Sequence, residues 1–198
     1  MRPIIRTLLA AAVLAVLPLA ANAESNTVTS GSANARLDFQ VTIPRVLMLQ
    51  VGASNSAIDQ INFDMSATPG NVGNGVAVAG TGGDLTGGAV TAKVLGNNGN
   101  VTLVATSGGP LKNATGDSIS YSEITTTPTT LNTATVLAAP TLADGASSSV
   151  TLTAVNKIVA QDAKWTFKYK NTNPVAPGVY GGSAAGGNGR VTYTASMP

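Results

Sequence analysis

The stretch Ala35–Gly52 reads ARLDFQVTIPRVLMLQVG and holds the clearest periodic pattern in the chain. Counting back from Ile43 to Ala33, the odd positions are apolar and the even positions are polar. A period of two is typical of a β-strand that buries one face. The pattern therefore predicts a strand over residues 33–43, and Pro44 ends it because proline has no N–H group to donate to a sheet.

Residues 1–23 are typical of a secretory signal peptide. Arg2 and Arg6 precede an apolar run, which is too short for a comfortable membrane span. Ala21 and Ala23 then supply small side chains where a signal peptidase cleaves. We therefore expect cleavage after Ala23 and export of the remaining chain from the cytoplasm.

Charge and aromatic content argue against a nucleic-acid partner. Two of the 11 basic residues lie in the predicted signal peptide, which leaves nine basic residues (11 − 2) against nine acidic ones. No basic cluster is present, and aromatic residues make up 4% of the chain. Only 10% of residues are charged, which favours a surface that packs against copies of itself over one that stays dispersed.

The chain contains no cysteine and no histidine. The familiar zinc, copper and haem sites are therefore excluded, as are Ser-His-Asp and Cys-His catalytic groups. The acidic pairs nearest in sequence are Asp59 with Asp64 and Asp117 with Glu123, and we interpret them as solvated loop charges. The glycine-rich segment 80–88 lacks the Lys-Ser/Thr ending of a phosphate-binding loop. We expect no enzyme activity, no cofactor and no metal.

The rest of the chain is punctuated like an all-β protein, with short β-rich runs between clusters of Gly, Ser, Thr, Asn and Pro. Two runs flank the turn-forming segment 96–100, and we expect them to pair as a hairpin. Trp165, Phe167 and Tyr169 alternate with polar residues, so their face is expected to be core. The most helix-like segment, 156–164, is too short for more than one turn. The predicted strands are residues 61–65, 89–95, 101–106, 118–124, 149–155, 165–170 and 190–196.

The two ends of the chain carry motifs that resemble those of a known family. Residues 39–52 read FQVTIPRVLMLQVG, an alternating strand that leads through a proline into an apolar segment and a turn. Near the other end, Pro177, Gly178, Tyr180 and Gly182 precede the strand RVTYTAS. Together these motifs resemble the pilin subunits of chaperone-usher pili, in particular the cysteine-free group with the colonisation-factor fimbriae. In the middle of the chain the resemblance covers only composition and strand spacing.

The resemblance implies an all-β fold, an immunoglobulin-like β-sandwich that lacks its last strand and is completed by a donor strand from the neighbouring subunit. It divides the chain into a signal peptide (1–23), an N-terminal extension with the donor strand (24–44) and a pilin domain (45–198). The groove-filling side chains of the donor strand would be Leu37, Phe39, Val41 and Ile43. The edge of the acceptor groove would consist of Val191, Tyr193 and Ala195.

The resemblance also implies where the protein goes and what it binds. A periplasmic chaperone would hold the subunit, and an outer-membrane usher would pass it to the cell surface. Identical subunits would polymerise there into a pilus that supports adhesion or biofilm formation, with a tip adhesin as a further candidate partner. Because the chain has room for one domain and carries its own donor strand, it fits the shaft of a pilus better than the tip.

Other interpretations of the same residues stay open. An ordinary first strand, paired within its own domain, would alternate over residues 33–43 in the same way. A secreted carbohydrate-binding module of the jelly-roll type is a second alternative, although the few aromatic residues fall mostly on predicted core faces. An outer-membrane barrel is disfavoured, since it needs repeated strands of about ten residues with aromatic girdles.

Overall fold

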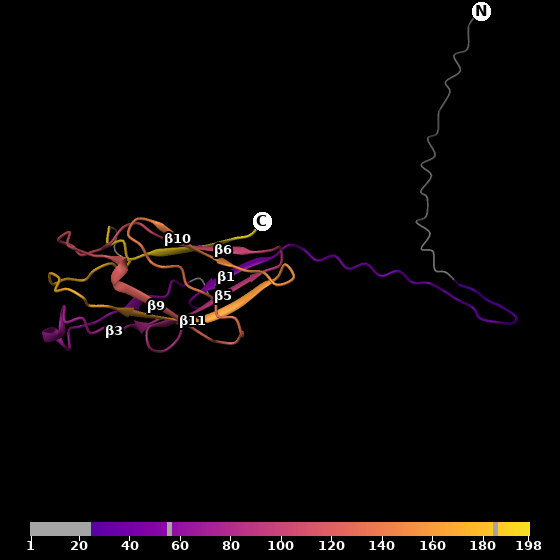
Figure 1. The fold of residues 1–198 in the computed structure, drawn as a ribbon, viewed down its shortest axis with the longest axis horizontal. Helices are drawn as coiled ribbons and strands as arrows, with labels where there is room; N and C mark the ends of the chain where they lie inside the picture. The colour runs from indigo at the N-terminus through magenta and orange to yellow at the C-terminus, as the bar shows by residue number, and fades with distance from the viewer. Residues whose placement is uncertain (1–24, 55–56, 184–185) are drawn as a thin grey trace, which may run out of the picture. The chain divides into compact units, whose positions relative to one another are not determined.

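A computed structural model describes residues 25–54, 57–183 and 186–198 (Figure 1). The predicted signal peptide, with its cleavage residues Ala21 and Ala23, lies outside the described residues. The chain divides after Ile43 into an N-terminal unit and a second unit that begins at Pro44. Every strand assigned among the described residues belongs to the second unit, and so do the sheets and the core.

The described residues fold into β-strands with no α-helix. Two segments form single turns of 3-10 helix, η1 (Pro69–Asn71) and η2 (Tyr121–Glu123). No helix in this part of the chain is long and apolar enough to cross a membrane. The strands are β1 (Leu47–Val51), β2 (Ile61–Asn62), β3 (Val78–Ala79), β4 (Thr81–Gly82), β5 (Ala89–Gly96), β6 (Val101–Ser107), β7 (Leu111–Lys112), β8 (Ser118–Ile119), β9 (Ile124–Thr129), β10 (Ser147–Leu152), β11 (Val159–Tyr169) and β12 (Val191–Ser196).

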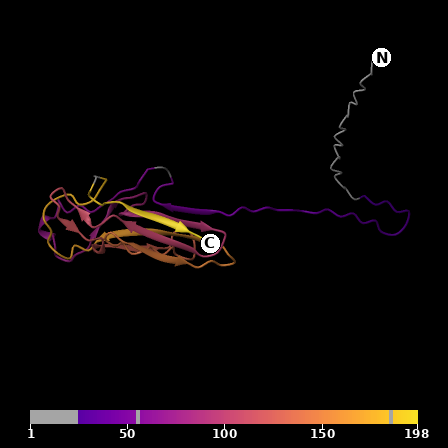
Figure 2. The same ribbon diagram turned by 90° about the horizontal axis from the view of Figure 1, so that it is seen from above.

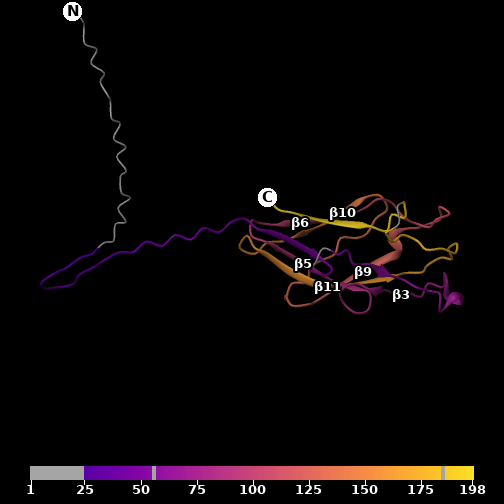
Figure 3. The ribbon, with the colours of Figure 1, turned by 180° about the vertical axis from the view of Figure 1, so that it is seen from behind.

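Two antiparallel sheets pack against each other, consistent with a β-sandwich (Figures 1 and 2). In the larger sheet β1 pairs with β5, β5 with β11, and β11 with both β3 and β9. In the smaller sheet β6 lies between β10 and β12. Figure 3 shows from behind that β6 and β10 form one layer while β5 and β11 form the other. The expected all-β class is confirmed.

Strands β5 and β6 occur where the sequence predicts them, but the predicted hairpin between them is wrong. The two strands belong to opposite sheets, and the short link 97–100 carries the chain from one sheet to the other. Val94 of β5 and Leu103 of β6 are both fully buried in the core between the sheets. In opposite sheets the two apolar rows bury each other, whereas in a hairpin they would lie side by side on one surface.

Strand β11 is the centre of the larger sheet and has 11 residues. Its side chains Trp165, Phe167 and Tyr169 are buried, as predicted, while Lys168 is exposed. The indole Nε1 of Trp165 donates a 2.8 Å hydrogen bond to the carbonyl oxygen of Leu137. A buried indole needs such an acceptor, so the aromatic face of β11 also orients a neighbouring loop.

The segment 156–164, where the sequence predicts one helical turn at most, is a tight turn followed by β11. Val155 and Ile158 exchange two backbone hydrogen bonds of 2.9 Å, and Asn156 and Lys157 between them have positive φ angles. Two residues with positive φ form the turn that best matches the twist of antiparallel strands. The apolar spacing that suggests a helical turn therefore comes from a two-residue turn placed directly before a strand.

The connection between β9 and β10, residues 130–146, closes one side of the sandwich. Leu137, in the middle of it, is fully buried in the core, and its N–H donates to the carbonyl oxygen of Asp162 on β11 (3.1 Å). At the far end, the Ser107 hydroxyl of β6 donates to the carbonyl oxygen of Ala143 (2.5 Å). The connection is therefore hydrogen-bonded to both sheets.

Asp162 anchors the start of this connection. Its side chain is 3% exposed, and Oδ1 accepts hydrogen bonds from the backbone N–H groups of Asn132 (3.0 Å) and Thr133 (2.8 Å). Burial alone would raise the pKa of Asp162, but the hydrogen bonds from Asn132 and Thr133 outweigh it and hold the pKa well below its usual range. The ionised carboxylate is thus the form that the fold stabilises.

The glycine-rich motif near the C-terminal end packs tightly before β12. A Cβ on Gly178 would come within 2.9 Å of Nδ2 of Asn113, in the loop between β7 and β8. A Cβ on Gly189 would come within 2.2 Å of the backbone nitrogen of Gly182. These close approaches explain why glycine is needed there.

Two predicted strands are shorter than expected. The run 61–65 keeps only β2, although the Phe63 ring still packs against Tyr169 at a centroid distance of 6.3 Å. The run 118–124 is divided into β8, η2 and the first residue of β9. The Ser120 hydroxyl accepts from the N–H of Ser122 and caps η2, which offers the backbone an alternative to the ladder.

Candidate functional site

The edges β1 and β12 lie on the same side of the sandwich, one from each sheet. Within the described residues β1 pairs only with β5, and β12 pairs only with β6. The two strands come close to each other but form no ladder together. An edge strand presents a row of N–H and C=O groups to which a further strand can pair. This side of the sandwich thus has two adjacent edges that a strand could join.

The two edges run in opposite directions. Leu47 at the start of β1 lies opposite Gly96, and Ser196 at the end of β12 lies opposite Thr102. Both of these ends are therefore beside the link 97–100. β1 runs away from that link and β12 runs toward it, so a strand between them must be antiparallel to one and parallel to the other.

The inward side chains of both edges are only partly covered. Fully buried core residues such as Val94 and Leu103 lie on the inner strands β5 and β6. The edge side chains, by contrast, pack against the core but stay half-buried, and they are Leu47, Leu49 and Val51 of β1 and Tyr193, Ala195 and Met197 of β12 and its end. The predicted acceptor residue Val191 is also half-buried. The core is thus incompletely covered along this side.

Tyr193 is the largest side chain on the β12 edge. Its ring lies 5.4 Å from the Trp165 ring, centroid to centroid, at 49°. Burial raises the pKa of Tyr193, and burial together with the charge of Asp144 raises the pKa of Tyr121 to about 12. The Tyr121 hydroxyl donates to the carbonyl oxygen of Asn188 (2.7 Å). The Tyr193 ring on the β12 edge thus packs against Trp165, which is fully buried in the core.

The predicted donor side chains are exposed. Leu37 is 76%, Phe39 86%, Val41 82% and Ile43 75% exposed. No strand is assigned over residues 33–43, so the strand predicted there is not formed within the described chain. Four large apolar side chains at every second position are thus presented to solvent, which is unusual in a protein surface.

Asn97, at the turn between β5 and β6, binds the chain just before β1. Its side-chain Nδ2 donates to the carbonyl oxygen of Pro44 (2.8 Å), and its Oδ1 accepts from the N–H of Val46 (2.8 Å). The backbone N–H of Asn97 also donates to the carbonyl oxygen of Val46 (3.3 Å). These three bonds extend the contact between β1 and β5 beyond the ladder itself.

The neighbouring residues of the same turn bind two other segments. Asn98 donates from Nδ2 to the carbonyl oxygen of Pro198 (2.5 Å), which also accepts from the Arg45 guanidinium. The N–H of Gly99 donates to the carbonyl oxygen of Lys157 in the turn before β11 (2.9 Å). The turn 97–99 therefore joins the start of β1, the end of β12 and the start of β11.

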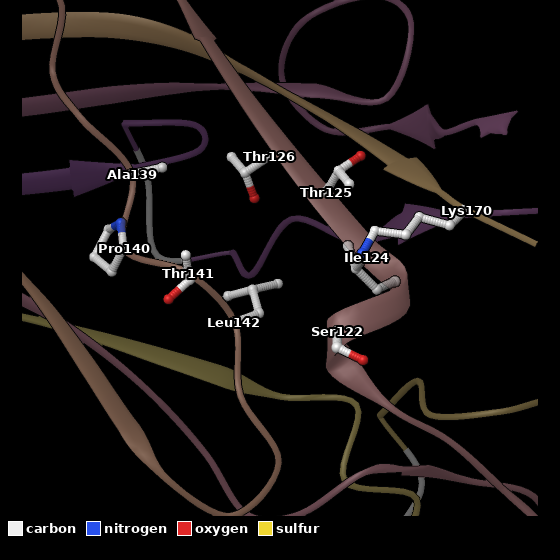
Figure 4. A pocket seen from close by; sticks show the side chains of 9 residues that line it. All are labelled: Ser122, Ile124, Thr125, Thr126, Ala139, Pro140, Thr141, Leu142 and Lys170. Carbon is white, nitrogen blue, oxygen red and sulfur yellow. The ribbon is translucent and has the colours of Figure 1, made fainter. Parts of the chain in front are cut away.

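A shallow pocket of about 360 Å³ lies between β9 and the connection 139–142 (Figure 4). Figure 4 shows Thr125 and Thr126 on β9 across from Thr141 and Leu142, with Lys170 at one end. None of the nine lining residues is aromatic, so the pocket offers no ring for stacking against a sugar. The pocket lies on the side of the sandwich that the chain closes by itself.

Three of the acidic residues singled out in the sequence accept hydrogen bonds within their own loops, whereas Glu123 accepts from the N–H of Thr172 in a distant segment. Asp59 accepts from the N–H of Ala53 (2.5 Å), and Asp64 accepts from the N–H of Ser66 (2.8 Å), which lowers the pKa of Asp64. Asp117 accepts from side chains of its own loop, and Glu123 accepts from a backbone N–H (3.1 Å). No group of three or more carboxylates that could hold a metal ion is found in the described part of the chain.

Several residues of this site are not identified by the sequence patterns. Leu47, Leu49 and Val51 form the second edge, but they lie in the nearly continuous apolar run VLMLQV, which hides which residues face inward. Only the alternation along the strand indicates which residues face inward, because Gln50, the single polar residue, falls on the opposite face from residues 47, 49 and 51. Asn97 reads as a turn former and carries no sequence signal for its bonds to residues 44 and 46.

No protein-family model matches the chain, and no curated protein or solved structure was found to be significantly similar to it. The resemblance to colonisation-factor pilins therefore rests on the motifs at the two ends of the chain. What the chain can do is best judged from the edges and the exposed segment themselves.

Proposed function

We propose that this chain is a structural subunit of a surface pilus and polymerises by donor-strand exchange. Residues 34–43 of one copy lie between β1 and β12 of the next, which completes an immunoglobulin-like sandwich that lacks its last strand. One observation carries the proposal. The same chain has four exposed apolar side chains at alternate positions and two adjacent edges whose inward side chains cover the core only in part.

The dimensions of the segment and of the edge agree. From Leu37 to Ile43 an extended chain covers six steps, about 20 Å at about 3.3 Å per residue. β12 has six residues and is of similar length. Alternation places the four apolar side chains on one face, and their burial contributes about 6–12 kcal/mol at about 1.5–3 kcal/mol each. The polar residues between them stay on the outer face, so the inserted strand needs only one apolar surface.

The proposal includes the route by which such a subunit reaches the surface. The predicted signal peptide directs the chain out of the cytoplasm, and a periplasmic chaperone covers the β1 and β12 edges until an outer-membrane usher joins the subunits. Identical subunits form the shaft, which supports adhesion or biofilm formation. No cofactor, metal or catalytic step is part of this function. No observation favours the rival carbohydrate-binding module over it, because the pocket beside β9 has no aromatic lining residue.

Three forms of the protein test the proposal. The first lacks residues 24–43. The second also lacks them at the N-terminal end but carries Asn34–Ile43 after Pro198 through a flexible linker, which keeps the effective concentration of the strand high. The third is the same fusion with Leu37→Ser and Val41→Ser. Size is measured by gel filtration and stability by thermal unfolding.

We expect the shortened form to aggregate or be degraded, because its edges stay open. The intact fusion should be a monomer whose Tm is higher than that of the serine variant by roughly 10–20 °C, since about 5 kcal/mol shifts Tm by that amount in a domain of this size. A shortened form that is already a stable, cooperatively unfolding monomer contradicts the proposal. The serine variant is the matched control, because it has the same linker and length.

A further inference from the structure

The strand that fills a second copy has a competitor in its own chain. Residues 44–46 join the segment 34–43 to β1, so the segment is covalently tethered to a domain with open edges. A short tether keeps the local concentration of a strand high, and self-insertion is then favoured over exchange between molecules. Polymerisation therefore requires something that opposes insertion of the segment into its own domain.

The directions of the strands limit how self-insertion can occur. Three connecting residues reach roughly 10 Å, so the segment would have to enter beside Leu47, where β1 begins. It would then run antiparallel to β1 and parallel to β12, because these two strands run in opposite directions. Such a return requires a tight turn within residues 44–46. A second copy has no tether to this domain and needs no such turn.

Asn97 holds the groups that this turn would have to move. Its side chain binds the carbonyl oxygen of Pro44 and the N–H of Val46, both at 2.8 Å, and its backbone N–H binds the carbonyl oxygen of Val46. A turn at residues 44–46 would break these hydrogen bonds. Pro44 adds to the restriction, because the residue before a proline is kept out of the helical region that many turns use.

We infer that Asn97 is a positioning residue that prevents residues 34–43 from inserting into their own domain, and so reserves β1 and β12 for a second copy. This inference rests on the proposed polymerisation. It assigns a role in assembly to a residue whose side chain binds the backbone of residues 44 and 46.

The test compares wild type with Asn97→Ala in the predicted mature chain, residues 24–198. Each protein is unfolded in guanidinium chloride and refolded over a range of concentrations, and size is measured by gel filtration with light scattering. Trypsin cleavage after Arg36 reports whether the segment is covered. We expect wild type to form oligomers that grow with concentration. Asn97→Ala should raise the ratio of monomer to oligomer roughly tenfold, the effect of losing two hydrogen bonds, with the bond after Arg36 protected in that monomer.

Two further variants make the comparison specific. Asn100 lies in the same turn, but its Oδ1 accepts from the N–H of Ala154 (2.9 Å), so Asn100→Ala is the matched control and should leave the wild-type distribution unchanged. Asn97→Asp keeps the acceptor for Val46 and removes the donor to Pro44. It should give an intermediate ratio, and it replaces Asn97→Ala if that variant does not fold.

The outcomes separate this inference from the proposed function. If wild type polymerises and Asn97→Ala gives the same size distribution, the inference is wrong and the proposed function stands. If Asn97→Ala is monomeric but is cut rapidly after Arg36, the segment has not inserted and the inference is wrong as well. If wild type remains a monomer at every concentration, the proposed function itself fails.

Discussion

The two sides of the sandwich are completed in different ways. On the β9–β10 side, the connection 130–146 crosses between the sheets and places Leu137 in the core, where it is fully buried. On the β1–β12 side, no strand of the described residues pairs with the outer edges, and Leu49 and Tyr193 stay half-buried. The first side is therefore covered by the chain itself, whereas along the second side the core stays partly exposed.

The two outer edges of the larger sheet differ in the same sense. β9 contains Pro128, a residue that discourages pairing with another chain. β1 reads LMLQV, with no proline and no charge. Proteins usually protect exposed edges, so an unprotected edge beside an incompletely covered core supports the proposed addition of a strand. The comparison shows that the two sides of one sandwich differ in how well their edges are protected and their core is covered.

The largest effect should come from the finished side. Leu137→Ala removes a side chain that is 0% exposed and should lower the free energy of unfolding by about 2–5 kcal/mol, measured by urea unfolding at pH 7. The loss arises from the cavity left between the sheets. Leu142→Ala is the control, because Leu142 lies in the same connection but is half-buried, and it should cost less than about 1 kcal/mol. Equal effects of the two substitutions would show that Leu137 does not close the core.

Asp162→Asn should weaken the same side by a smaller amount. The amide oxygen of asparagine can still accept from the backbone N–H groups of Asn132 and Thr133, but its NH2 group cannot accept from the Asn132 side-chain Nδ2, which donates to Oδ2 in the wild type (2.9 Å). The variant also loses the charge that strengthens the remaining hydrogen bonds, so we expect a loss of about 1–3 kcal/mol at pH 7. The pKa of Asp162 is lowered in the folded state, so its stabilising effect is present above the unfolded pKa of about 4 and is lost as the pH falls below it. Urea unfolding at pH 7, 4 and 2.5 should show that the difference in free energy of unfolding between wild type and variant becomes smaller as the pH falls. A constant difference would contradict this assignment.

The sequence patterns predict the all-β class and most strands, because alternation reports which face of a strand is buried. The buried aromatic face of β11 is confirmed, although the strand begins at Val159 and not at residue 165 as predicted, and the terminal strand β12 is confirmed within one residue. Alternation does not report which strand pairs with which. β5 and β6 therefore read as a hairpin although they belong to opposite sheets, and only the packing of Val94 and Leu103 into one core decides between the two arrangements.

The open side could be predicted only in part. The pattern identifies β12 as a strand with a half-buried face, and it identifies Leu37 to Ile43 as a matching row. That β1 lies beside β12 depends on sheet topology, which local patterns do not contain. The contacts of Asn97 depend on where a turn meets a segment about 50 residues earlier in the chain. Such contacts follow from the tertiary fold and have no local signature.

The most direct test of the comparison comes from Leu49 on the open side, where the expected effect is a difference of about 1–2 kcal/mol between two forms of the protein. Because Leu49 is half-buried, Leu49→Ala should cost about 1 kcal/mol in the fusion with Leu37→Ser and Val41→Ser, whose strand does not fill the groove. In the intact fusion, which carries the unchanged Asn34–Ile43 after Pro198, the added strand covers Leu49, and the same substitution should cost about 2–3 kcal/mol, because it now leaves a cavity. Urea unfolding of the two pairs measures the difference, and Leu142→Ala in both forms is the control, since its surroundings do not change. If Leu49→Ala has the same small effect in both forms, the added strand does not lie over β1. The β1 edge would then be finished in the subunit alone, and the contrast between the two sides of the sandwich would disappear.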